Sequence, residues 1–248
     1  MMPPRRVAIL QSNYIPWKGY FDLIRAVDLF IVYDDRQFTK NDWRNRNRIK
    51  AANGLGWLTI PVETSEKFGQ TIEETRVARR IGKPSWAHAH WARLQQCYQH
   101  ASFFADYGPL VRDMLLAVAD EPMLSQINIV LLRGLCELLN IRTPLVFSRD
   151  FAVAGRKGDR VLALCQAANA THYLSGPAAR SYLDPRIFDD AGIRLAFADY
   201  TDYPEYPQLH GPFEHGVSVL DLLFHTGPNA QSYMTPLGDW SSSRHSGG

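Results

Sequence analysis

At 248 residues, with 46% hydrophobic and 21% charged residues, the chain has the composition of an ordinary globular protein. Its formal net charge of +2 argues against a surface coated with basic side chains for nucleic acid, so any recognition of anions must be local. The three cysteines lack CxxC spacing, which favours reduced thiols in a cytoplasmic protein over disulfides or zinc, and no apolar run suits a signal peptide or a membrane span.

The first part of the chain predicts parallel strands joined by a helix. Residues 6–11 (RVAILQ) and 29–35 (LFIVYDD) are short apolar runs typical of buried strands, and the apolar residues of 18–28 recur at near-helical spacing. This order is that of a βαβ unit, in which the strands are parallel and the crossover is right-handed. Residues 56–63 (GWLTIPVE) predict a further strand.

The middle of the chain is helical in pattern, and the last third alternates again. Helices are expected at 86–104, 109–119 and 123–139. They are followed by expected strands at 143–148, 171–176 and 193–200 and expected helices at 157–170, 177–192 and 216–227. The predicted fold class is therefore α/β with a parallel sheet. We expect one domain over residues 1–235, a helical insert at about 84–140 and a disordered tail at 236–248.

The turn between the first strand and its helix is a candidate binding site. Ligands of open α/β sheets bind outside the carboxyl ends of the strands, beside helix N-termini whose free N–H groups favour anions. The turn offers amides, a hydroxyl, aromatic rings and a cation from Gln11, Ser12, Asn13, Tyr14, Trp17 and Lys18. The alternative is a strand exit that is polar only because loops lie at the surface.

Two carboxylates, Asp34 and Asp35, end the second strand at the same edge of the sheet. Neighbouring residues of a strand point to opposite faces, so at most one of the two is expected to face the site. Either is a candidate general base or holder of a metal-bound water. A carboxylate among arginines is expected to have a lowered pKa, which suits the positioning of charge better than proton abstraction near neutral pH.

The segment that follows is rich in cations and amides. In an extended segment, alternate residues share a face. One face would carry Arg44, Arg46, Arg48 and Lys50, and the other Trp43, Asn45, Asn47 and Ile49, with Lys40 just before. Four cations on one face repel one another unless an anion lies opposite, and the guanidinium fork suits phosphate or carboxylate. The alternative is a solvated edge strand protected by its charge.

A third candidate lies where the strand expected at 171–176 ends. Ser175 and Gly176 precede a proline, and Arg180 follows one turn later. Backbone N–H groups, the hydroxyl and the guanidinium would form a phosphate cradle, and an ordinary helix begun by proline fits equally well.

The histidines give a weaker signal. His88 and His90 are two residues apart, which points them away from each other on a helix, so no metal site is expected there. His215 beside Glu214 is a candidate acid–base pair. The sequence has no GxSxG motif, P-loop or complete Rossmann glycine fingerprint, which removes support for serine hydrolases and P-loop NTPases.

Five blocks of the chain resemble the WbqC-like family in the order of their motifs. They are LQSNYIPWKGYFDLI (10–24), DLFIVYDDRQFTKNDWRNRNRIK (28–50), WLTIPV (57–62), YLSGPAARSYLD (173–184) and SVLDLLFHTG (218–227). Members are typically encoded with genes for O-antigen and other bacterial surface polysaccharides. The resemblance implies a cytoplasmic enzyme that acts on glycan precursors, by group transfer to an activated amino sugar or a nucleotide-sugar.

A second likeness is to the nucleotidylyltransferase-like HIGH superfamily, which has a Rossmann-like (HUP-like) parallel sheet. There, the first helix carries an HxGH-type signature, and PWKGYFDLI has that arrangement with Lys18 and Tyr20 where histidines would be expected. The block YLSGPAARSYL lies where a later Ser-containing phosphate motif would fall. The likeness implies the same fold, and a nucleotidylyltransferase-like ligase is one alternative function.

Together these features predict an enzyme that binds a phosphate-bearing small molecule, such as a nucleotide-sugar, between the first two loops. The residues expected to hold phosphates are Arg44, Arg46, Arg48 and Lys18, joined by Arg180. Tyr14 and Trp17 would stack on a base or a sugar. The candidate catalytic residues are Asp34, Asp35 and Lys18.

The competing hypothesis is a module without catalysis that binds nucleic acid or a partner enzyme. The near-neutral charge makes nucleic acid the weaker choice. The sequence identifies no cofactor, and it leaves open whether the chain forms a homodimer.

Overall fold

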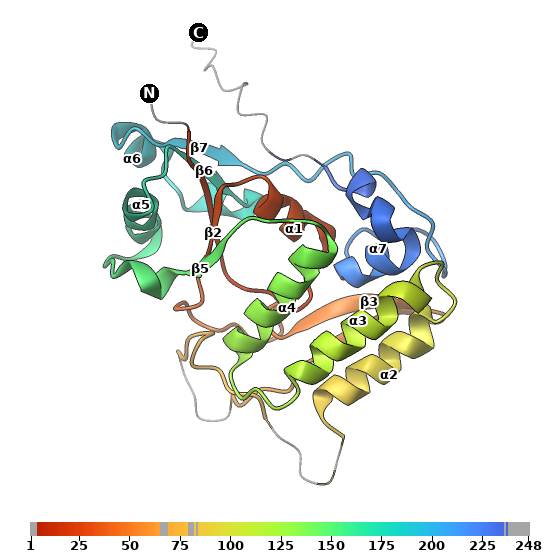
Figure 1. Cartoon of the computed structure of the whole chain (residues 1–248). Coiled ribbons are helices and arrows are strands. Elements are labelled where there is room, and N and C mark those ends of the chain that lie inside the picture. Colours follow the sequence, from red (N-terminus) through yellow and green to blue (C-terminus); the bar gives the residue numbers. More distant parts are fainter. Residues whose placement is uncertain (1–3, 65–68, 79–81, 83, 236, 238–248) are drawn as a thin grey trace.

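The centre of the computed structural model is a parallel sheet of five strands in the order β5-β2-β1-β6-β7 (Figure 1). The structure describes residues 4–64, 69–78, 82, 84–235 and 237. The strands are β1 (Arg6–Leu10), β2 (Leu29–Val32), β5 (Leu145–Phe147), β6 (His172–Ser175) and β7 (Arg194–Phe197). The order reverses between β1 and β6, which is where open α/β sheets bind ligands. The prediction of an α/β fold with a Rossmann-like sheet is confirmed.

Helices cover both faces of this sheet. On one face lie α1 (Lys18–Arg25) and α4 (Leu124–Leu138), and on the other α5 (Lys157–Ala167) and α6 (Pro185–Asp190) (Figure 1). The described part of the chain has seven α-helices in all.

The alternation of side chains along β2 assigns them to two buried clusters. Phe30 and Val32 pack in the cluster on the α1 and α4 side, whereas Leu29 and Ile31 pack with α5 and α6. Because the period of two continues past the strand, Asp34 and Asp35 also lie on opposite sides.

A β-hairpin and three helices form a second layer beside α4. The hairpin pairs β3 (Arg46–Ala51) with β4 (Gly54–Thr59), and the helices are α2 (Trp86–Tyr98), α3 (Phe104–Ala117) and α7 (Val219–Thr226) (Figure 1). Gly54 closes the hairpin turn with a φ of 108°, a conformation that residues with a side chain rarely adopt. Three short 3-10 segments, Ser148–Phe151, Pro177–Ser181 and Gly227–Tyr233, complete the described elements.

One helix begins earlier than expected. The helix predicted to start at Pro109 starts at Phe104, because Tyr107 already donates its backbone N–H to the carbonyl of Phe103, and the helix continues through the proline. The basic segment also differs, since β3 begins only at Arg46 and leaves the preceding residues in a turn.

The helix predicted at 177–192 is divided in two. A 3-10 turn over Pro177–Ser181 is followed by α6, which starts afresh because Asp184 caps its first turn and Pro185 occupies the first helical position. The expected tail at 236–248 lies outside the described residues apart from Leu237. Among the described residues, none of the helices has the length and apolar character that crossing a membrane requires.

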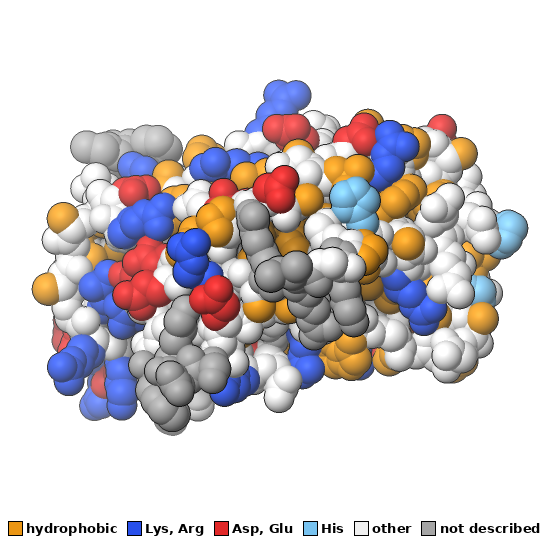
Figure 2. Space-filling model, turned by 90° about the horizontal axis from the view of Figure 1, so that it is seen from below, with side chains coloured by type: hydrophobic (Ala, Val, Ile, Leu, Met, Phe, Trp, Pro, Cys, Tyr) orange, Lys and Arg blue, Asp and Glu red, His pale blue; other side chains and the backbone are white. Residues whose placement is uncertain are grey.

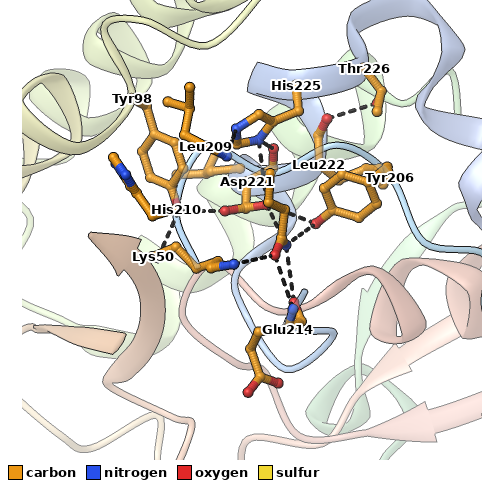
Figure 3. Close-up of polar contacts among 12 residues, drawn as sticks. Lys50, Tyr98, Tyr206, Leu209, His210, Glu214, Asp221, Leu222, His225 and Thr226 are labelled. Carbon is orange, nitrogen blue, oxygen red and sulfur yellow. Dashed lines mark hydrogen bonds and ion pairs between the residues drawn. The ribbon is translucent and has the colours of Figure 1, made fainter. Parts of the chain in front are cut away.

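Residues 198–217 connect β7 to α7 without a regular helix or strand, and a buried carboxylate fastens them (Figure 3). Asp221 of α7 is fully buried. It accepts hydrogen bonds from Tyr98 Oη at 2.9 Å, Tyr206 Oη at 2.9 Å and Gln208 Nε2 at 2.8 Å. The carboxylate therefore joins α7 to α2 and to two residues of the connecting segment.

Gln208 extends this network to the end of the segment. Its Nε2 donates to Glu214 O at 3.1 Å, and its Oε1 accepts from Glu214 N at 3.0 Å and from Lys50 Nζ at 2.8 Å. The backbone just before His215 is thus tied to β3 and to α7.

Replacing Asp221 with alanine should lower the free energy of unfolding by about 2 kcal/mol or more, because the two buried hydroxyls of Tyr98 and Tyr206 lose their acceptor at roughly 1–3 kcal/mol each. Chemical denaturation measures the change. The control is Asp113→Ala, which removes an exposed carboxylate from α3 and should change stability by less than about 0.5 kcal/mol. If the two variants were equally stable, Asp221 would not be what fastens the segment.

Candidate functional site

A cavity of about 290 Å³ lies where the turn after β1 meets β3. Its size is at the lower limit of the roughly 300–1,000 Å³ typical of small-molecule sites. It lies beyond the carboxyl end of β1, at the sheet edge where ligands of such folds bind. Its walls are Asn13, Pro16, Trp17, Trp43, Asn47, Arg48, His215 and Gly216.

The buried carboxylate of Asp34 holds the turn that forms one wall. Its Oδ1 accepts from Ser12 N at 2.8 Å, and its Oδ2 accepts from the hydroxyls of Ser12 at 2.7 Å and Ser125 at 2.5 Å. Because Ser125 belongs to α4, this side chain joins the end of β2, the turn after β1 and a helix. Burial raises the pKa of Asp34, against the hydrogen bonds from Ser125 and Ser12 and the charge of Arg44. The lowered pKa expected from neighbouring arginines is therefore wrong for Asp34, because desolvation outweighs them.

Arg44 connects the basic segment to the same turn. Its guanidinium donates to the side-chain oxygens of Asn13 and Gln11, and its backbone carbonyl accepts from Asn128 Nδ2 at 2.9 Å. Asn128, also on α4, donates to Ser12 Oγ at 2.9 Å as well. Two nitrogens of Arg44 are thus engaged by protein acceptors.

Asn47 fixes the other half of the turn. Its Nδ2 donates to the carbonyls of Tyr14 at 3.1 Å and Ile15 at 3.0 Å. Ile15 has a φ of 35°, in the left-handed region that β-branched residues rarely enter, and such strain persists only where the surroundings enforce it. A further backbone bond, Tyr14 N to Trp43 O at 3.0 Å, ties the turn to the segment before β3.

Two tryptophans form the apolar walls of the cavity. Trp17 packs edge-on against Tyr200, with ring centroids 5.0 Å apart, and Trp43 tilts against Trp57 at 5.5 Å. Gly19 permits the position of Trp17, because a Cβ there would overlap the indole ring.

The polar side of the cavity combines a guanidinium with a histidine. Arg48 Nε donates to Gly216 O at 2.9 Å, and its Nη2 lies 3.8 Å from Glu214 Oε1. Glu214, expected to pair with His215, therefore pairs with Arg48. The Nδ1 atom of His215 has no hydrogen-bond partner among the described residues.

The electrostatic surroundings keep His215 neutral. Burial lowers its pKa, and so does the positive charge of Lys18, while Glu205 and Glu214 oppose the shift. Since an ordinary histidine titrates near 6.5, the ring is uncharged at neutral pH and one ring nitrogen can accept a proton.

Lys18 lies behind the wall and does not line the cavity. Its Nζ donates to Pro204 O at 3.0 Å and lies over the rings of Tyr203 at 4.8 Å, Tyr206 at 5.2 Å and Phe213 at 5.9 Å. Burial lowers the pKa of Lys18 to about 8, although the charge of Asp22 opposes this. The cation fastens the segment that carries His215 onto α1, and its charge acts on that ring.

Neither carboxylate at the end of β2 reaches the cavity. Asp34 has its oxygens occupied in the interior, as described. Asp35 lies on the α5 side, where it pairs with Arg160 and accepts from Ser148 Oγ at 3.0 Å. The prediction that the two point to opposite faces is confirmed, and both are engaged by donors of the protein.

Several other candidate residues hold the fold together instead of lining the cavity. Tyr14 is fully buried, and its hydroxyl bonds His90 Nδ1 at 2.8 Å, so its ring offers no stacking face. Asn45 is buried and donates to Ile60 O at 2.8 Å. Lys40 is exposed in the turn before the hairpin.

The predicted sharing of one face by the cations holds only in part. Arg46 and Arg48 lie on the outer face of β3 and Asn47 on the inner one, but Trp43 packs on the arginine side because the chain turns there. Lys50 is buried and bonded to Gln208.

The third candidate is separate from the cavity. Ser175 is buried and accepts a hydrogen bond from Tyr173 Oη at 3.1 Å, and Arg180 lies over the Phe197 ring at 4.4 Å. Gly176 precedes a five-residue 3-10 turn, so the helix start expected to cradle a phosphate is absent at this place. None of the three lines the cavity.

Three lining residues were missed or given little weight: Pro16, Gly216 and His215. They come together only because residues 198–217 cross over β3, and no local sequence pattern predicts that crossing. The hairpin itself had a signal in the Asn53-Gly54 dipeptide, a common turn between paired strands.

A larger cavity of about 970 Å³ lies at the start of α2, beside Trp86, His88 and His90. Its described lining includes the carboxylates Asp120 and Glu121 and no lysine or arginine, so it does not suit a phosphate. Burial lowers the pKa of His90 to about 4, which keeps that ring neutral. Over the described residues, no group of three or more His, Cys, Asp or Glu side chains is placed to hold a metal ion.

Substituting alanine for Asp34 should lower the free energy of unfolding by about 2–4 kcal/mol, because Ser12 and Ser125 lose a buried acceptor. The control is Asp113→Ala, which removes an exposed carboxylate and should change stability by less than about 0.5 kcal/mol. Urea denaturation of both variants measures the difference. An Asp34→Ala protein as stable as wild type would contradict the structural role of this carboxylate.

Comparison with known proteins agrees with the motifs. The model of the WbqC-like protein family matches residues 11–233, which span every wall of the cavity. A protein of Mycobacterium tuberculosis (strain ATCC 25618 / H37Rv) named "Uncharacterized protein Rv1507c" is 49% identical over 230 residues, covering 93% of this chain and 97% of that protein. No solved structure matches the chain significantly. The chain belongs to the WbqC-like protein family.

Proposed function

We propose that the protein is a group-transfer enzyme of bacterial surface-polysaccharide biosynthesis that acts on a sugar bearing a phosphate or a nucleotide. The observation that carries the proposal is the make-up of the 290 Å³ cavity: two tryptophan walls, a guanidinium and a histidine ring with an unpaired nitrogen. The resemblance to a family encoded with polysaccharide genes supports the choice of substrate class.

Each wall has a part in binding such a substrate. Tryptophan rings offer apolar faces to the C–H groups of a sugar. Asn13 uses its side-chain oxygen to accept from Arg44, which leaves its Nδ2 group to donate to a sugar hydroxyl. Arg48 supplies a positive charge and further N–H donors for a phosphate.

The number of phosphate-binding cations is smaller than the sequence suggested. Arg48 is the cation of the described lining. Arg44 is bonded to Asn13 and Gln11, and Lys18 is enclosed by aromatic rings. We therefore assign the phosphate to Arg48 and give Arg44 and Lys18 positioning roles.

His215 is the general base of the proposal. Transfer of a group to a hydroxyl or amino group requires a base that takes the proton of the attacking atom. His215 lines the cavity and is held neutral by burial and by Lys18, so it can accept that proton near pH 7. This role replaces the one considered for Asp34 and Asp35, which lie outside the cavity.

A nucleic-acid-binding module has weaker support. Figure 2 shows basic and acidic side chains interspersed over the described part of one face, without the continuous basic surface that phosphate backbones require.

The substrate class is tested by thermal-shift and calorimetric titration with nucleotide-sugars, sugar 1-phosphates and unmodified sugars. Wild type should bind the phosphate-bearing probes, and Arg48→Ala should weaken that binding about tenfold or more, because a charge-assisted hydrogen bond is worth about 1.5–3 kcal/mol. Arg112→Ala, an exposed arginine of α3, is the control and should bind as wild type does. Binding of none of the phosphate-bearing sugars by wild type would refute the proposal.

The tuning of His215 by Lys18 predicts a pH effect. In Lys18→Met the positive charge is gone and the imidazolium is less disfavoured, so the pKa of His215 should rise and the ring should become protonated at higher pH than in wild type. If activity needs the neutral ring, the fall in activity on the acid side of the pH–rate profile would begin at a higher pH in Lys18→Met than in wild type. NMR titration of the His215 ring, assigned with a His215→Ala sample, measures the shift. An unchanged or lower pKa in Lys18→Met would contradict the coupling.

A further inference from the structure

We infer that the outer face of the β3–β4 hairpin binds the nucleotide part of the substrate, a nucleoside diphosphate, while the sugar occupies the cavity. This inference rests on the proposed function and specifies its substrate as a nucleotide-sugar. It concerns four side chains, Arg46, Trp57, Trp43 and Arg48, which we call the Arg–Trp ladder.

The cavity is too small for a whole nucleotide-sugar. Its volume of about 290 Å³ suits a single small group and lies at the lower limit for small-molecule sites. A nucleotide-sugar adds a base, a ribose and two phosphates to that group. Whatever surrounds the mouth of the cavity must therefore contact the nucleotide.

The four side chains of the ladder lie in a row. The guanidinium carbon of Arg46 lies 4.2 Å from the Trp57 ring centre, the Trp57 and Trp43 centroids are 5.5 Å apart, and Arg48 lies 5.7 Å from the Trp43 ring centre. The hairpin register sets this spacing, because Arg48 pairs directly with Trp57 across the two strands. Two neighbouring indole rings are thus flanked by a positive charge at each end of the row.

Both tryptophan rings of the ladder are exposed to solvent. Trp57 is 46% exposed and Trp43 is 39% exposed, which is unusual for rings that also make ordered contacts. The guanidinium of Arg46 also donates to the backbone carbonyl of Asn41, and that of Arg48 to the carbonyl of Gly216. The ladder is therefore ordered before any ligand arrives, which reduces the entropy cost of binding.

The ladder is continuous with the cavity. Trp43 and Arg48 belong both to the ladder and to the cavity wall. A ligand whose sugar lies between Trp17 and Trp43 would thus place its phosphates at Arg48 and its base farther along the hairpin, beside Trp57 and Arg46. Bases stack on aromatic rings and guanidinium planes, and guanidinium forks bind phosphate oxygens, so the ladder supplies both contacts.

A single nucleotide fits the ladder better than a nucleic-acid strand does. The ladder has two aromatic members and ends at the cavity, which also carries the Arg48–Glu214 contact at 3.8 Å. A strand would need a basic groove that continues beyond it.

The test compares affinities of three variants for separate parts of the substrate. The probes are UDP-, dTDP- and GDP-linked sugars, the free nucleoside diphosphates, a sugar 1-phosphate and a ten-residue oligothymidylate, each titrated by calorimetry. Trp57→Ala changes the ladder and removes none of the residues that line the cavity. Leu55→Ala is its matched control, because Leu55 lies on the same strand with 44% exposure and is outside the ladder. His215→Ala changes the cavity alone.

We expect Trp57→Ala to lower the affinity for nucleoside diphosphates and nucleotide-sugars about tenfold, because one base-stacking contact is lost. The variant should bind the sugar 1-phosphate as wild type does. His215→Ala should weaken binding of the sugar 1-phosphate and of the nucleotide-sugars and leave binding of the free nucleoside diphosphates as in wild type, because it changes only the cavity that holds the sugar. Leu55→Ala should match wild type throughout. Melting temperatures confirm that each variant is folded.

Three results would overturn the inference, and they separate it from the proposed function. If Trp57→Ala bound nucleotide-sugars as tightly as wild type, the ladder would be wrong and the function would survive. If wild type bound sugar 1-phosphates and no nucleotide, the substrate would be a sugar phosphate and the ladder would again be wrong. If only the oligothymidylate bound, with an affinity that fell steeply with salt and was lost in Trp57→Ala, the face would bind nucleic acid and both proposals would fail.

Discussion

The fold and the site both depend on one buried charge, the carboxylate of Asp34. A carboxylate removed from water must be compensated by hydrogen bonds, and those available come from the turn after β1 and from α4, through Ser12 and Ser125. Meeting that requirement fixes the distance between the central sheet and its covering helix. It also fixes the turn, and from the turn Asn13 and Gln11 receive the guanidinium of Arg44, which draws the basic segment against the sheet edge. The cavity is the space left when these constraints are satisfied.

A second buried carboxylate brings the remaining wall. Asp221 and Gln208 tie the long segment after β7 to α7, α2 and β3, and so place His215 and Gly216 opposite the turn. Lys18 has two effects on this segment. Its ammonium group contacts the aromatic side chains of the segment, and its charge lowers the pKa of His215. Positions separated by some two hundred residues in the chain thus share one small volume because buried polar groups require each other as partners.

The sequence predicted the sheet well and the site in part, for physical reasons. Short continuous apolar runs report buried strands directly, so the five parallel strands could be foreseen. The alternation of side chains along a strand separated Asp34 from Asp35. Polar residues near a strand end are ambiguous, because the same side chains that bind a ligand can bind other groups of the protein. Tyr14, Asn45 and Arg44 took the second role. The approach of His215 and the pairing of Trp57 with Arg48 depend on long-range contacts, which leave no local signature.

The central claim is that the cavity beside Trp17, Trp43 and His215 receives the sugar of the substrate. A crystal structure with a bound nucleotide-sugar tests this most directly. The account predicts electron density for the sugar between the two tryptophan walls, with a phosphate oxygen within hydrogen-bonding distance of Arg48. Density in the larger cavity at the start of α2, with the smaller one occupied only by solvent, would contradict it.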